Sequence, residues 1–476
     1  MGAESRERMF LRSALTAENR FYPAGETLPW IASRSAASPF RVERIPLESI
    51  DGWSFEDATG NMVHRSGKFF RVEGLRVSTN VGPTSRWEQP IIDQPEIGIL
   101  GIAAKRFDGV LYFLMQAKME PGNIDPVQIT PTVQATRSNY TQVHQGARPR
   151  YVEYFLEPGR GRSLVDQLQY EQASTFLGKR NRNMVVLVDE DVPVHEDFRW
   201  LTLGEVKQLL RVPNLVSMDA RTVLSCIPLV DQADARRAGG GIPPDLEPCL
   251  DPWQQGLLAS MSKAGRALHS DGDVTGWLAG MRCRYELSVA RMDLASLAGW
   301  TRDYDAICHD ERRYFSVVGV RVRATNREVA SWDQPLVKST EQGLVAFLVK
   351  RINDVPHFLV QGKVEPGNPD IVAVGPTVQC ALGGERVADC ASWPRYLDAV
   401  LDAPADTVRF AAVQSEEGGR FYHVENDYRV IELDADGHSE APDGYRWVTL
   451  RQLNQLLRYG QVNMEARSLL SCLSLI

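Results

Sequence analysis

Apolar and polar side chains alternate along residues 113–120, which is the pattern of a β-strand with one buried face. Residues 358–365 repeat this alternation. In the first segment one face carries Phe113, Met115, Ala117 and Met119, and the other carries Gln116, Lys118 and Glu120. In the second segment the faces carry Phe358, Val360, Gly362 and Val364, and Gln361, Lys363 and Glu365. Both segments run into Pro-Gly-Asn, which predicts that each strand ends in a turn.

Further elements follow from the same reasoning. A second polar strand face is predicted from the spacing of Thr130, Thr132, Gln134 and Thr136. TLGEVKQLLRV from Thr202 and TLRQLNQLLRY from Thr449 have leucines at helical spacing after a threonine that can cap the helix. Residues 251–267 also have helical spacing and mirror a helix that begins near Met9. The predicted fold class is therefore mixed, α+β or α/β.

The chain contains one module twice. Residues 70–136 align without a gap to residues 315–381, with 27 identities in 67 positions. WEQP, QAKMEPGN and PTVQ in the first copy match WDQP, QGKVEPGN and PTVQ in the second. Glycines and prolines at 238–244 are typical of a linker. We therefore predict an N-terminal domain over 1–230, a linker over 231–250 and a C-terminal domain over 251–476.

Composition narrows the function. A net charge of −8, with acidic and basic residues interspersed, does not favour nucleic acid as a partner. The start of the chain has no apolar signal segment, and no run approaches the length of a membrane span, so we expect a cytoplasmic protein without a membrane partner. The seven cysteines are widely spread and are predicted to be reduced thiols.

The polar strand faces have two interpretations. Charged strand faces are most often solvated. Between the two copies, however, the apolar face changes, from Met115 to Val360 and from Met119 to Val364, whereas Gln, Lys and Glu stay identical. This contrast favours a binding site, in which amides pair with sugar hydroxyls and a Lys beside a Glu moves protons.

Two aromatic pairs stay ambiguous. Trp87 and Trp332 fit either core packing or a flat surface for stacking a base. His64 and its counterpart His309 fit either an acid-base role or a buried histidine with satisfied hydrogen bonds.

Common cofactor motifs are absent from the sequence. The eight histidines are scattered, and neither a GxGxxG fingerprint nor a GxxxxGK[ST] loop occurs. We therefore expect no metal and no redox cofactor.

The quoted motifs, together with HRSGKFF at 64, PTVQATRSNY at 131 and KRNRNMVV at 179, are similar to those of the NDP-hexose 2,3-dehydratases of deoxysugar biosynthesis in bacterial secondary metabolism. The resemblance covers nearly the whole chain. It implies a tandem pair of Nudix-hydrolase-like modules, a homodimer, and two nucleotide pockets of which one is catalytic. The Nudix box itself occurs in neither copy, so pyrophosphate hydrolysis is not implied.

The same resemblance implies a dTDP-4-keto-6-deoxyhexose as substrate. In such a sugar the C3 proton is acidified by the C4 carbonyl, and the C2 hydroxyl leaves once an enolate has formed. The product would tautomerise to a 3,4-diketo-2,6-dideoxyhexose, an unstable compound that a downstream 3-ketoreductase would take.

The charge of the two copies differs. Lys179, Arg180 and Arg182 align with Val424, Glu425 and Asp427, and residues 138–140 align with Gly383, Gly384 and Glu385. A diphosphate would prefer the first copy, which we therefore predict to be catalytic. Cations found only in the second copy argue against this choice; they are Arg327, Arg420 and Arg429.

These considerations give a set of candidate residues. Glu120 or Tyr140 is the candidate base at C3, Lys118 the donor to O4, and His64 the acid for the leaving hydroxyl. Candidate substrate-binding residues are Trp87, Gln116, Asn123, Thr132, Gln134, Ser138, Asn139, Arg150, Lys179, Arg180 and Arg182. The second pocket would contain Trp332, Gln361, Lys363, Glu365, Asn368, Gln379 and Arg395. The rival functions are a sugar-nucleotide epimerase and a non-catalytic nucleotide-sugar binding protein.

Overall fold

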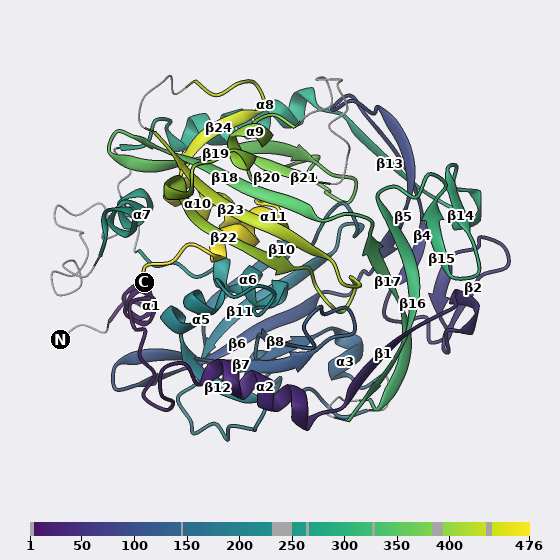
Figure 1. Ribbon diagram of the computed structural model, residues 1–476, viewed down its shortest axis with the longest axis horizontal. Helices are drawn as coiled ribbons and strands as arrows, with labels where there is room; N and C mark the ends of the chain where they lie inside the picture. Colours follow the sequence, from purple (N-terminus) through teal and green to yellow (C-terminus); the bar gives the residue numbers. More distant parts are fainter. Residues whose placement is uncertain are drawn as a thin grey trace.

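Two large sheets lie side by side in the computed structural model, one from each repeat (Figure 1). The structure describes residues 4–143, 146–230, 250–262, 266–325, 329–382, 394–434 and 440–476. The first sheet consists of β6 (Gly98–Phe107), β7 (Val110–Met119), β8 (Val127–Thr130), β9 (Val133–Ala135), β10 (Arg162–Tyr170), β11 (Arg180–Leu187) and β12 (Phe198–Thr202). The second consists of β18 (Gly343–Ile352), β19 (Val355–Val364), β20 (Val372–Gly375), β21 (Val378–Ala381), β22 (Val408–Ser415), β23 (Glu425–Leu433) and β24 (Tyr445–Thr449).

The two large sheets have the same topology. Their strand orders are β10-β11-β6-β7-β12 and β22-β23-β18-β19-β24, and each has one parallel pair, β11 with β6 and β23 with β18. In each sheet two short strands pair with the central hairpin. The mixed fold class and the duplication predicted from the sequence are confirmed.

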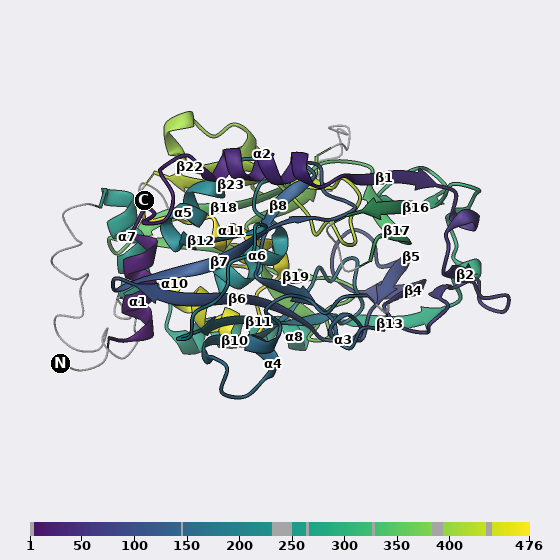
Figure 2. The same cartoon turned by 90° about the horizontal axis from the view of Figure 1, so that it is seen from below.

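Two smaller sheets exchange strands between the repeats. One is formed by β2 (Trp53–Phe55), β3 (Met62–His64), β4 (Arg71–Thr79), β5 (Arg86–Asp93) and, from the second repeat, β13 (Leu287–Met292). The other is formed by β14 (Trp300–Arg302), β15 (Ala306–His309), β16 (Phe315–Ala324), β17 (Ser331–Ser339) and, from the first repeat, β1 (Phe40–Ile45). Figures 1 and 2 show β1 running along β16, and β13 beside β4. The repeats are therefore interlocked and do not simply follow one another.

Helices cover the sheets and join them. They are α1 (Arg6–Ala14), α2 (Thr27–Ala37), α3 (Arg137–Tyr140), α4 (Glu153–Leu156), α5 (Leu203–Leu209), α6 (Met218–Ser225), α7 (Pro252–Ser262), α8 (Asp271–Arg284), α9 (Leu397–Leu401), α10 (Leu450–Arg458) and α11 (Met464–Ser471). Short 3-10 turns occupy η1 (Leu47–Ser49), η5 (Leu294–Ser296) and η6 (Ala405–Thr407). Helices α6 and α11 pack against each other. Helix α6 also packs on the first large sheet and α11 on the second, and one hydrophobic cluster runs through the two repeats.

Two fully buried arginines stabilise this central contact. Arg221 of α6 donates from Nε to Oγ of Ser468 over 2.6 Å, and Arg467 of α11 donates from Nε to Oγ1 of Thr222 over 3.2 Å. A buried guanidinium needs several acceptors, and backbone carbonyls accept from its other nitrogens. The reciprocal bonds fix one repeat against the other.

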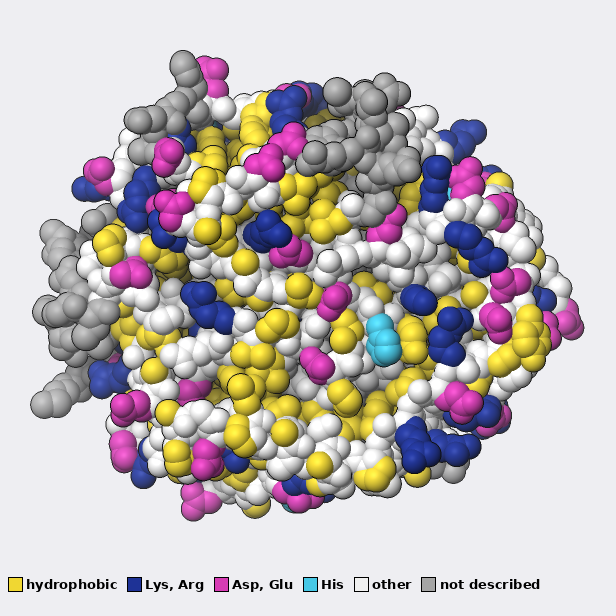
Figure 3. Space-filling model, in the orientation of Figure 1, with side chains coloured by type: hydrophobic (Ala, Val, Ile, Leu, Met, Phe, Trp, Pro, Cys, Tyr) yellow, Lys and Arg dark blue, Asp and Glu magenta, His cyan; other side chains and the backbone are white. Residues whose placement is uncertain are grey.

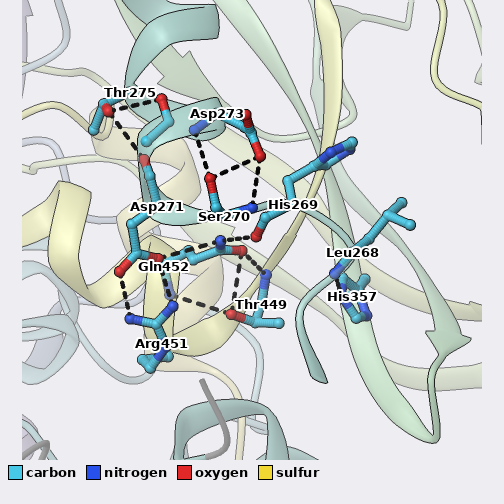
Figure 4. Close-up of polar contacts among 11 residues, drawn as sticks. Leu268, His269, Ser270, Asp271, Asp273, Thr275, His357, Thr449, Arg451 and Gln452 are labelled. Carbon is cyan, nitrogen blue, oxygen red and sulfur yellow. Dashed lines mark hydrogen bonds and ion pairs between the residues drawn. The ribbon is translucent and has the colours of Figure 1, made fainter. Parts of the chain in front are cut away.

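Sequence signals explain the helix ends. Thr202 and Thr449 cap α5 and α10 as predicted, each by accepting from the backbone N–H three residues later. Figure 4 shows the start of α8, where Ser270 and Asp273 form a reciprocal capping box. Asp271 pairs there with Arg451 of α10, with 2.9 Å between Oδ2 and Nη1.

Other predictions had mixed outcomes. The predicted helices near Met9 and over 251–267 appear as α1 and α7. Residues 130–136 do not form one strand. The chain breaks between β8 and β9 at Pro131, which has no N–H for the ladder. The glycine-rich part of the predicted linker, at 238–244, lies outside the described residues, as do Gly383, Gly384, Glu385 and Arg327.

The cysteines that the structure describes are unpaired, as the sequence predicted. Cys226, Cys283, Cys308, Cys380 and Cys472 are free thiols. None of the helices in the described ranges is both long and apolar enough to span a bilayer. On the face shown in Figure 3, basic side chains are interspersed with acidic ones.

Candidate active site

A cavity of about 590 Å³ lies between the two repeats. The first repeat lines it with residues of β6, β7, β9 and α6. The second repeat lines it with residues of β17 and with Glu417, Gly419 and Arg420. The strand exchange explains this arrangement, because β17 pairs with β16 and β16 pairs with β1 of the first repeat. Residues of both copies of the module therefore form the lining of one cavity.

Lys118 and Glu120 form an ion pair in this cavity. The distance from Nζ of Lys118 to Oε1 of Glu120 is 2.8 Å, and Lys118 also donates to Oε1 of Gln134 over 3.1 Å. The two charged side chains are 9% and 11% exposed, so little water screens the pair. The predicted alternation is confirmed for the apolar face, since Phe113, Met115, Ala117 and Met119 are all in the core.

Glu171, Asp219 and Glu417 are three of the five further carboxyl groups that line the cavity. Burial raises the pKa of all three. Repulsion from neighbouring carboxylates raises the pKa of Asp219 and of Glu417 further, although Arg420 and Lys118 oppose the rise at Glu417. The pKa of Glu417 is raised to about 7. The cavity can therefore hold a carboxyl proton near neutral pH.

Lys179 and Asn181 also line this cavity. Asn181 donates from Nδ2 to Oε1 of Glu171 over 2.6 Å, and Lys179 donates to the backbone oxygen of Glu96. Burial lowers the pKa of Lys179 to about 8, against the attraction of Glu171, which raises it. Lys179 is therefore a buried cation that meets the cavity with little competing solvent.

Arg180 and Arg182 do not join Lys179. Alternate residues of β11 point to opposite faces, and these two arginines lie on the face away from Asn181. The guanidinium of Arg180 lies 5.6 Å from the ring centre of Tyr170, and Arg182 pairs with Asp166. The cluster expected at 179–182 is therefore divided, and only Lys179 reaches the cavity.

Arg420 comes from the second repeat but lines the cavity with the first repeat's residues. Its guanidinium lies 4.3 Å from the ring centre of Phe70, and Nη2 donates to Oε1 of Gln94 over 3.2 Å. In the sequence, Arg420 is one of the cations that favour the second copy as the catalytic one. Its position instead adds a cation beside Lys118 and Lys179.

The repeated Pro-Gly-Asn turn holds the second repeat's loop in place. The N–H of Gly122 donates to the carbonyl oxygen of Gly418 over 2.7 Å, and the carbonyl of Gly122 accepts from the N–H of His423 over 2.9 Å. A Cβ at residue 122 would overlap the backbone of Phe421, so only glycine fits. Gly367 has the same role toward Phe176 in the other direction. The predicted binding residue Asn123 belongs to this turn and donates to the backbone of Pro126.

Aromatic side chains line another part of the cavity, namely Trp53, His64, Phe69 and Trp332. Nδ1 of His64 is 2.7 Å from Oγ of Ser66, and the rings of Trp53 and Phe69 lie edge-on to the imidazole. Burial and the charge of Arg65 lower the pKa of His64, so the ring is neutral at pH 7. Trp332 was expected in the second pocket. The strand exchange brings it to the first repeat's cavity instead.

Several predicted residues lie elsewhere. Trp87 packs against a buried cluster that includes Leu75, and Tyr140 packs against one that includes Ile99. The hydroxyl of Thr132 and the backbone and hydroxyl of Ser138 are used in bonds to Leu114 and Glu96. Neither these residues nor Gln116 and Arg150 line the cavity. Of the substrate-binding candidates, the structure brings together Gln134, Asn139 and Lys179.

The corresponding side chains of the second repeat bond mainly to one another. Lys363 donates to the backbone oxygen of Gln379 over 3.2 Å, and Gln379 donates to Oε1 of Glu365 over 3.3 Å. Asn463 donates to Oε1 of Gln379 over 2.9 Å. The remaining candidates differ in setting: Gln361 bonds to Thr377, Asn368 is buried in its turn, and Arg395 is exposed.

Sequence reasoning missed Asp219, Glu171, Glu417 and Arg420 as cavity residues. Glu171 and Glu416 were visible as a matched pair in the repeat. The difference between Gln172 and Glu417 at the next position was also visible. Nothing in the sequence indicated that residue 417 faces the other repeat's strands. In the described parts of the chain, no group of three or more His, Cys, Asp or Glu is arranged to hold a metal ion.

Comparison with known proteins identifies the family. The sequence profile described as NDP-hexose 2,3-dehydratase matches residues 24–227 and 271–473, one match in each repeat. The chain belongs to the NDP-hexose 2,3-dehydratase family. A relative from Saccharopolyspora spinosa, named dTDP-4-dehydro-6-deoxy-alpha-D-glucopyranose 2,3-dehydratase, is 49% identical over 98% of this chain and 94% of its own.

Two further relatives have the same name as the protein from Saccharopolyspora spinosa. Proteins of the same name from Amycolatopsis orientalis and Streptomyces violaceoruber are 46% and 45% identical, over 97% and 93% of this chain and 92% and 95% of theirs. The chain is thus an enzyme, a hydro-lyase, as the sequence predicted. A solved structure of an ADP compounds hydrolase is 13% identical and covers 30% of this chain and 75% of that chain. Its TM-score of 0.21 is too low to indicate a shared fold. The Nudix-like topology stays an implication of the family resemblance.

Proposed function

We propose that this dehydratase removes water between C2 and C3 of dTDP-4-keto-6-deoxyglucose, in the cavity that contains Lys118 and Glu120. The named relatives, at 45–49% identity over nearly the whole chain, support this reaction. The main support for this site is the nearly buried Lys118–Glu120 pair in a cavity of about 590 Å³. That volume is in the range of small-molecule sites in proteins.

The base at C3 is Glu120 in this proposal. Abstraction of the C3 proton leaves negative charge on O4 of the sugar, so a cation must lie close to the base. Lys118 is such a cation, because its ammonium is 2.8 Å from the carboxylate of Glu120. Tyr140, the other candidate base, packs against a hydrophobic cluster and does not line the cavity, so it has no role in this mechanism.

The nucleotide part is bound by cations and aromatic rings. Arg420 and Lys179 would meet the diphosphate, since guanidinium and ammonium groups form strong hydrogen bonds with phosphate oxygens. Trp332 and Trp53 would provide flat apolar surfaces for the base. Asn139 and Gln134 would pair with sugar hydroxyls. His64, neutral and held by Ser66, would help to hold the nucleotide.

The first repeat is favoured as the catalytic copy by three differences. Lys179, Arg420 and Glu417 line its cavity. Their counterparts for the second repeat's site are Val424, Thr175 and Gln172. Those replacements remove two cations and one acid, so the second site lacks both the diphosphate ligands and the extra carboxyl.

Loss of water does not change the overall oxidation state of the sugar, so the proposed reaction uses no redox cofactor. A cytoplasmic location is supported by the five free thiols among the described cysteines, because reducing compartments keep thiols unpaired. A homodimer, a role in antibiotic biosynthesis and a downstream 3-ketoreductase rest on the family resemblance.

A single incubation tests the reaction. The protein is mixed with dTDP-4-keto-6-deoxyglucose in D₂O, and the sugar nucleotides are analysed by mass spectrometry. The proposal predicts a product lighter by one water. An epimerase would keep all the oxygen atoms and add deuterium at C3, and a binding protein would return the substrate unchanged. Either of these results would refute the proposal.

A further inference from the structure

The residues after β10 and β22 form two related contacts near the centre of the molecule. In one, Glu416 accepts hydrogen bonds from the side-chain amides of Gln172 and Asn426. In the other, Glu171 accepts from the amide of Asn181 over 2.6 Å. The repeat places Glu417 where the first contact has Gln172. An amide always has N–H groups to donate, whereas a carboxyl group can donate only when it is protonated.

The surroundings of Glu417 favour that proton. The negative charges that act on it belong to Glu120 and Glu171, and the positive charges belong to Arg420 and Lys118. The charge of Glu417 in turn acts on Asp219 of α6 and helps to raise the pKa of that carboxyl group. Burial is the largest cause of the raised pKa of Glu417, because a low-dielectric setting disfavours the charged form. Glu417 also lines the cavity and is thus accessible to a bound sugar.

We propose that Glu417, supplied by the second repeat, is the acid that protonates the departing C2 hydroxyl in the first repeat's cavity. This inference rests on the proposed dehydration. Glu120 takes the C3 proton, and the C3–H electron pair forms the C3–C4 double bond with the charge on O4 next to Lys118. The enolate then collapses, C2–C3 becomes the double bond, and the C2–O bond breaks. Glu417 gives its proton to that oxygen, which leaves as water.

The proton balance closes in the next step. The enol product has a hydroxyl on C3 and tautomerises to the 3,4-diketone. Glu120 returns the abstracted proton to C2, and the C3 hydroxyl proton goes to the carboxylate of Glu417. Both groups are then in their starting states, and no oxidant or co-reactant is required.

Two other groups fit the acid role less well. His64 is neutral at pH 7 and its Nδ1 is engaged with Ser66. Asp219 lies in the first turn of α6 and has a carboxylate counterpart, Glu465, in the second repeat. Glu417 differs, because only the first repeat's cavity has a carboxyl group at this position.

The test is the variant Glu417→Gln, which copies the residue that the fold already has at position 172. The full-length enzyme is incubated with dTDP-4-keto-6-deoxyglucose in D₂O. Two quantities are measured: the rate at which water is lost, and the amount of deuterium incorporated at C3 of the recovered substrate. Glu417→Gln should lower the rate of water loss by about 10²- to 10⁴-fold, the usual contribution of one proton-transfer group. Deuterium should continue to enter C3, because Glu120 and Lys118 are unchanged.

Glu417→Asp serves as the matched variant, since it keeps the acid and shortens its reach by one methylene. It should recover part of the water loss. The inference is overturned if Glu417→Gln eliminates water at the wild-type rate, or if it loses deuterium exchange and elimination together. Failure of the wild-type enzyme to eliminate water would instead refute the proposed function.

Discussion

The N–H of Gly122 donates to the carbonyl oxygen of Gly418 over 2.7 Å, and this bond ties the end of one repeat's central strand to the loop of the other. The loop places Glu417 and Arg420 in the cavity next to Lys118. The Pro-Gly-Asn motif therefore has an architectural function. It holds a loop of the second repeat against the cavity that the first repeat lines.

Substitution of Gly122 tests this architecture. Gly122→Ala places a Cβ into the backbone of Phe421, so the loop must move. Overpacking of this kind costs about 1–3 kcal/mol, and we expect a lower melting temperature together with a large loss of turnover. Thermal unfolding and product formation measure the two effects.

The matched control is Gly276→Ala in α8, where a Cβ meets nothing within 4 Å. Alanine in a helix interior is favoured over glycine by about 0.5–1 kcal/mol, so this variant should be as stable as the wild type or more so. Equal behaviour of the two variants would contradict the role of Gly122.

Arg420 should contribute to nucleotide affinity. Arg420→Met keeps much of the packing on Phe70 but removes the charge. A hydrogen bond to a charged group contributes about 1.5–3 kcal/mol, which corresponds to dTDP binding weaker by about 10- to 100-fold. Titration calorimetry with dTDP measures this change.

Arg429→Met is the control, because Arg429 also occurs only in the second repeat but pairs with Asp427. It does not line the cavity, so its affinity for dTDP should equal that of the wild type. A comparable loss of affinity in both variants would indicate a general charge effect instead of a contact with the diphosphate.

The value of kcat/KM should decrease as the pH rises above about 7. The proposed acid must carry its proton, and the pKa of Glu417 is raised to about 7. As pH rises through this value the protonated fraction decreases, so kcat/KM should decrease by tenfold for each further pH unit. A pH–rate profile of the wild-type enzyme tests this. A constant kcat/KM from pH 7 to pH 9 would contradict the assignment.

His357 should make stability depend on pH. Figure 4 shows it beside Leu268. Nε2 of His357 accepts a hydrogen bond from the N–H of Leu268 over 3.0 Å, and Nδ1 lies 3.0 Å from the carbonyl oxygen of Val355. Burial lowers the pKa of this fully buried histidine below 6.5. The unfolded chain therefore takes up the proton first, and the free energy of unfolding decreases as pH falls below 6.5.

Denaturant unfolding at pH 7.5 and pH 5.5 measures this contribution. His357→Gln can still accept from Leu268 but does not titrate, so the variant should lose part of the difference between the two pH values. His195→Gln, a change at an exposed histidine, should retain the full difference. If His357→Gln retained it as well, the buried histidine would not be the cause.

Local patterns predicted the parts of the structure that depend on neighbouring residues. Period-two alternation gave the β7 strand with its apolar face in the core, and the threonines at 202 and 449 gave the helix starts. The ion pair of Lys118 and Glu120 follows from the same alternation, because residues two apart on a strand share a face.

Long-range pairing was not predictable in the same way. Strands β4 and β16 come from equivalent parts of the repeat, so the sequence does not tell whether β1 pairs with its own repeat or with the other. This choice decides where Trp332, Glu417 and Arg420 lie. The division of the cluster at 179–182 was predictable. Strand alternation alone places Arg180 and Arg182 on the face opposite to Lys179 and Asn181.

The central claim is that dehydration occurs in the cavity with Lys118 and not at the equivalent site with Lys363. Turnover of dTDP-4-keto-6-deoxyglucose by Lys118→Met and by Lys363→Met, at matched folded concentration, tests it most directly. We expect Lys118→Met to lose about 10²-fold or more in kcat, and Lys363→Met to stay within about tenfold of the wild type. Loss of turnover in Lys363→Met with near-normal turnover in Lys118→Met would contradict the account.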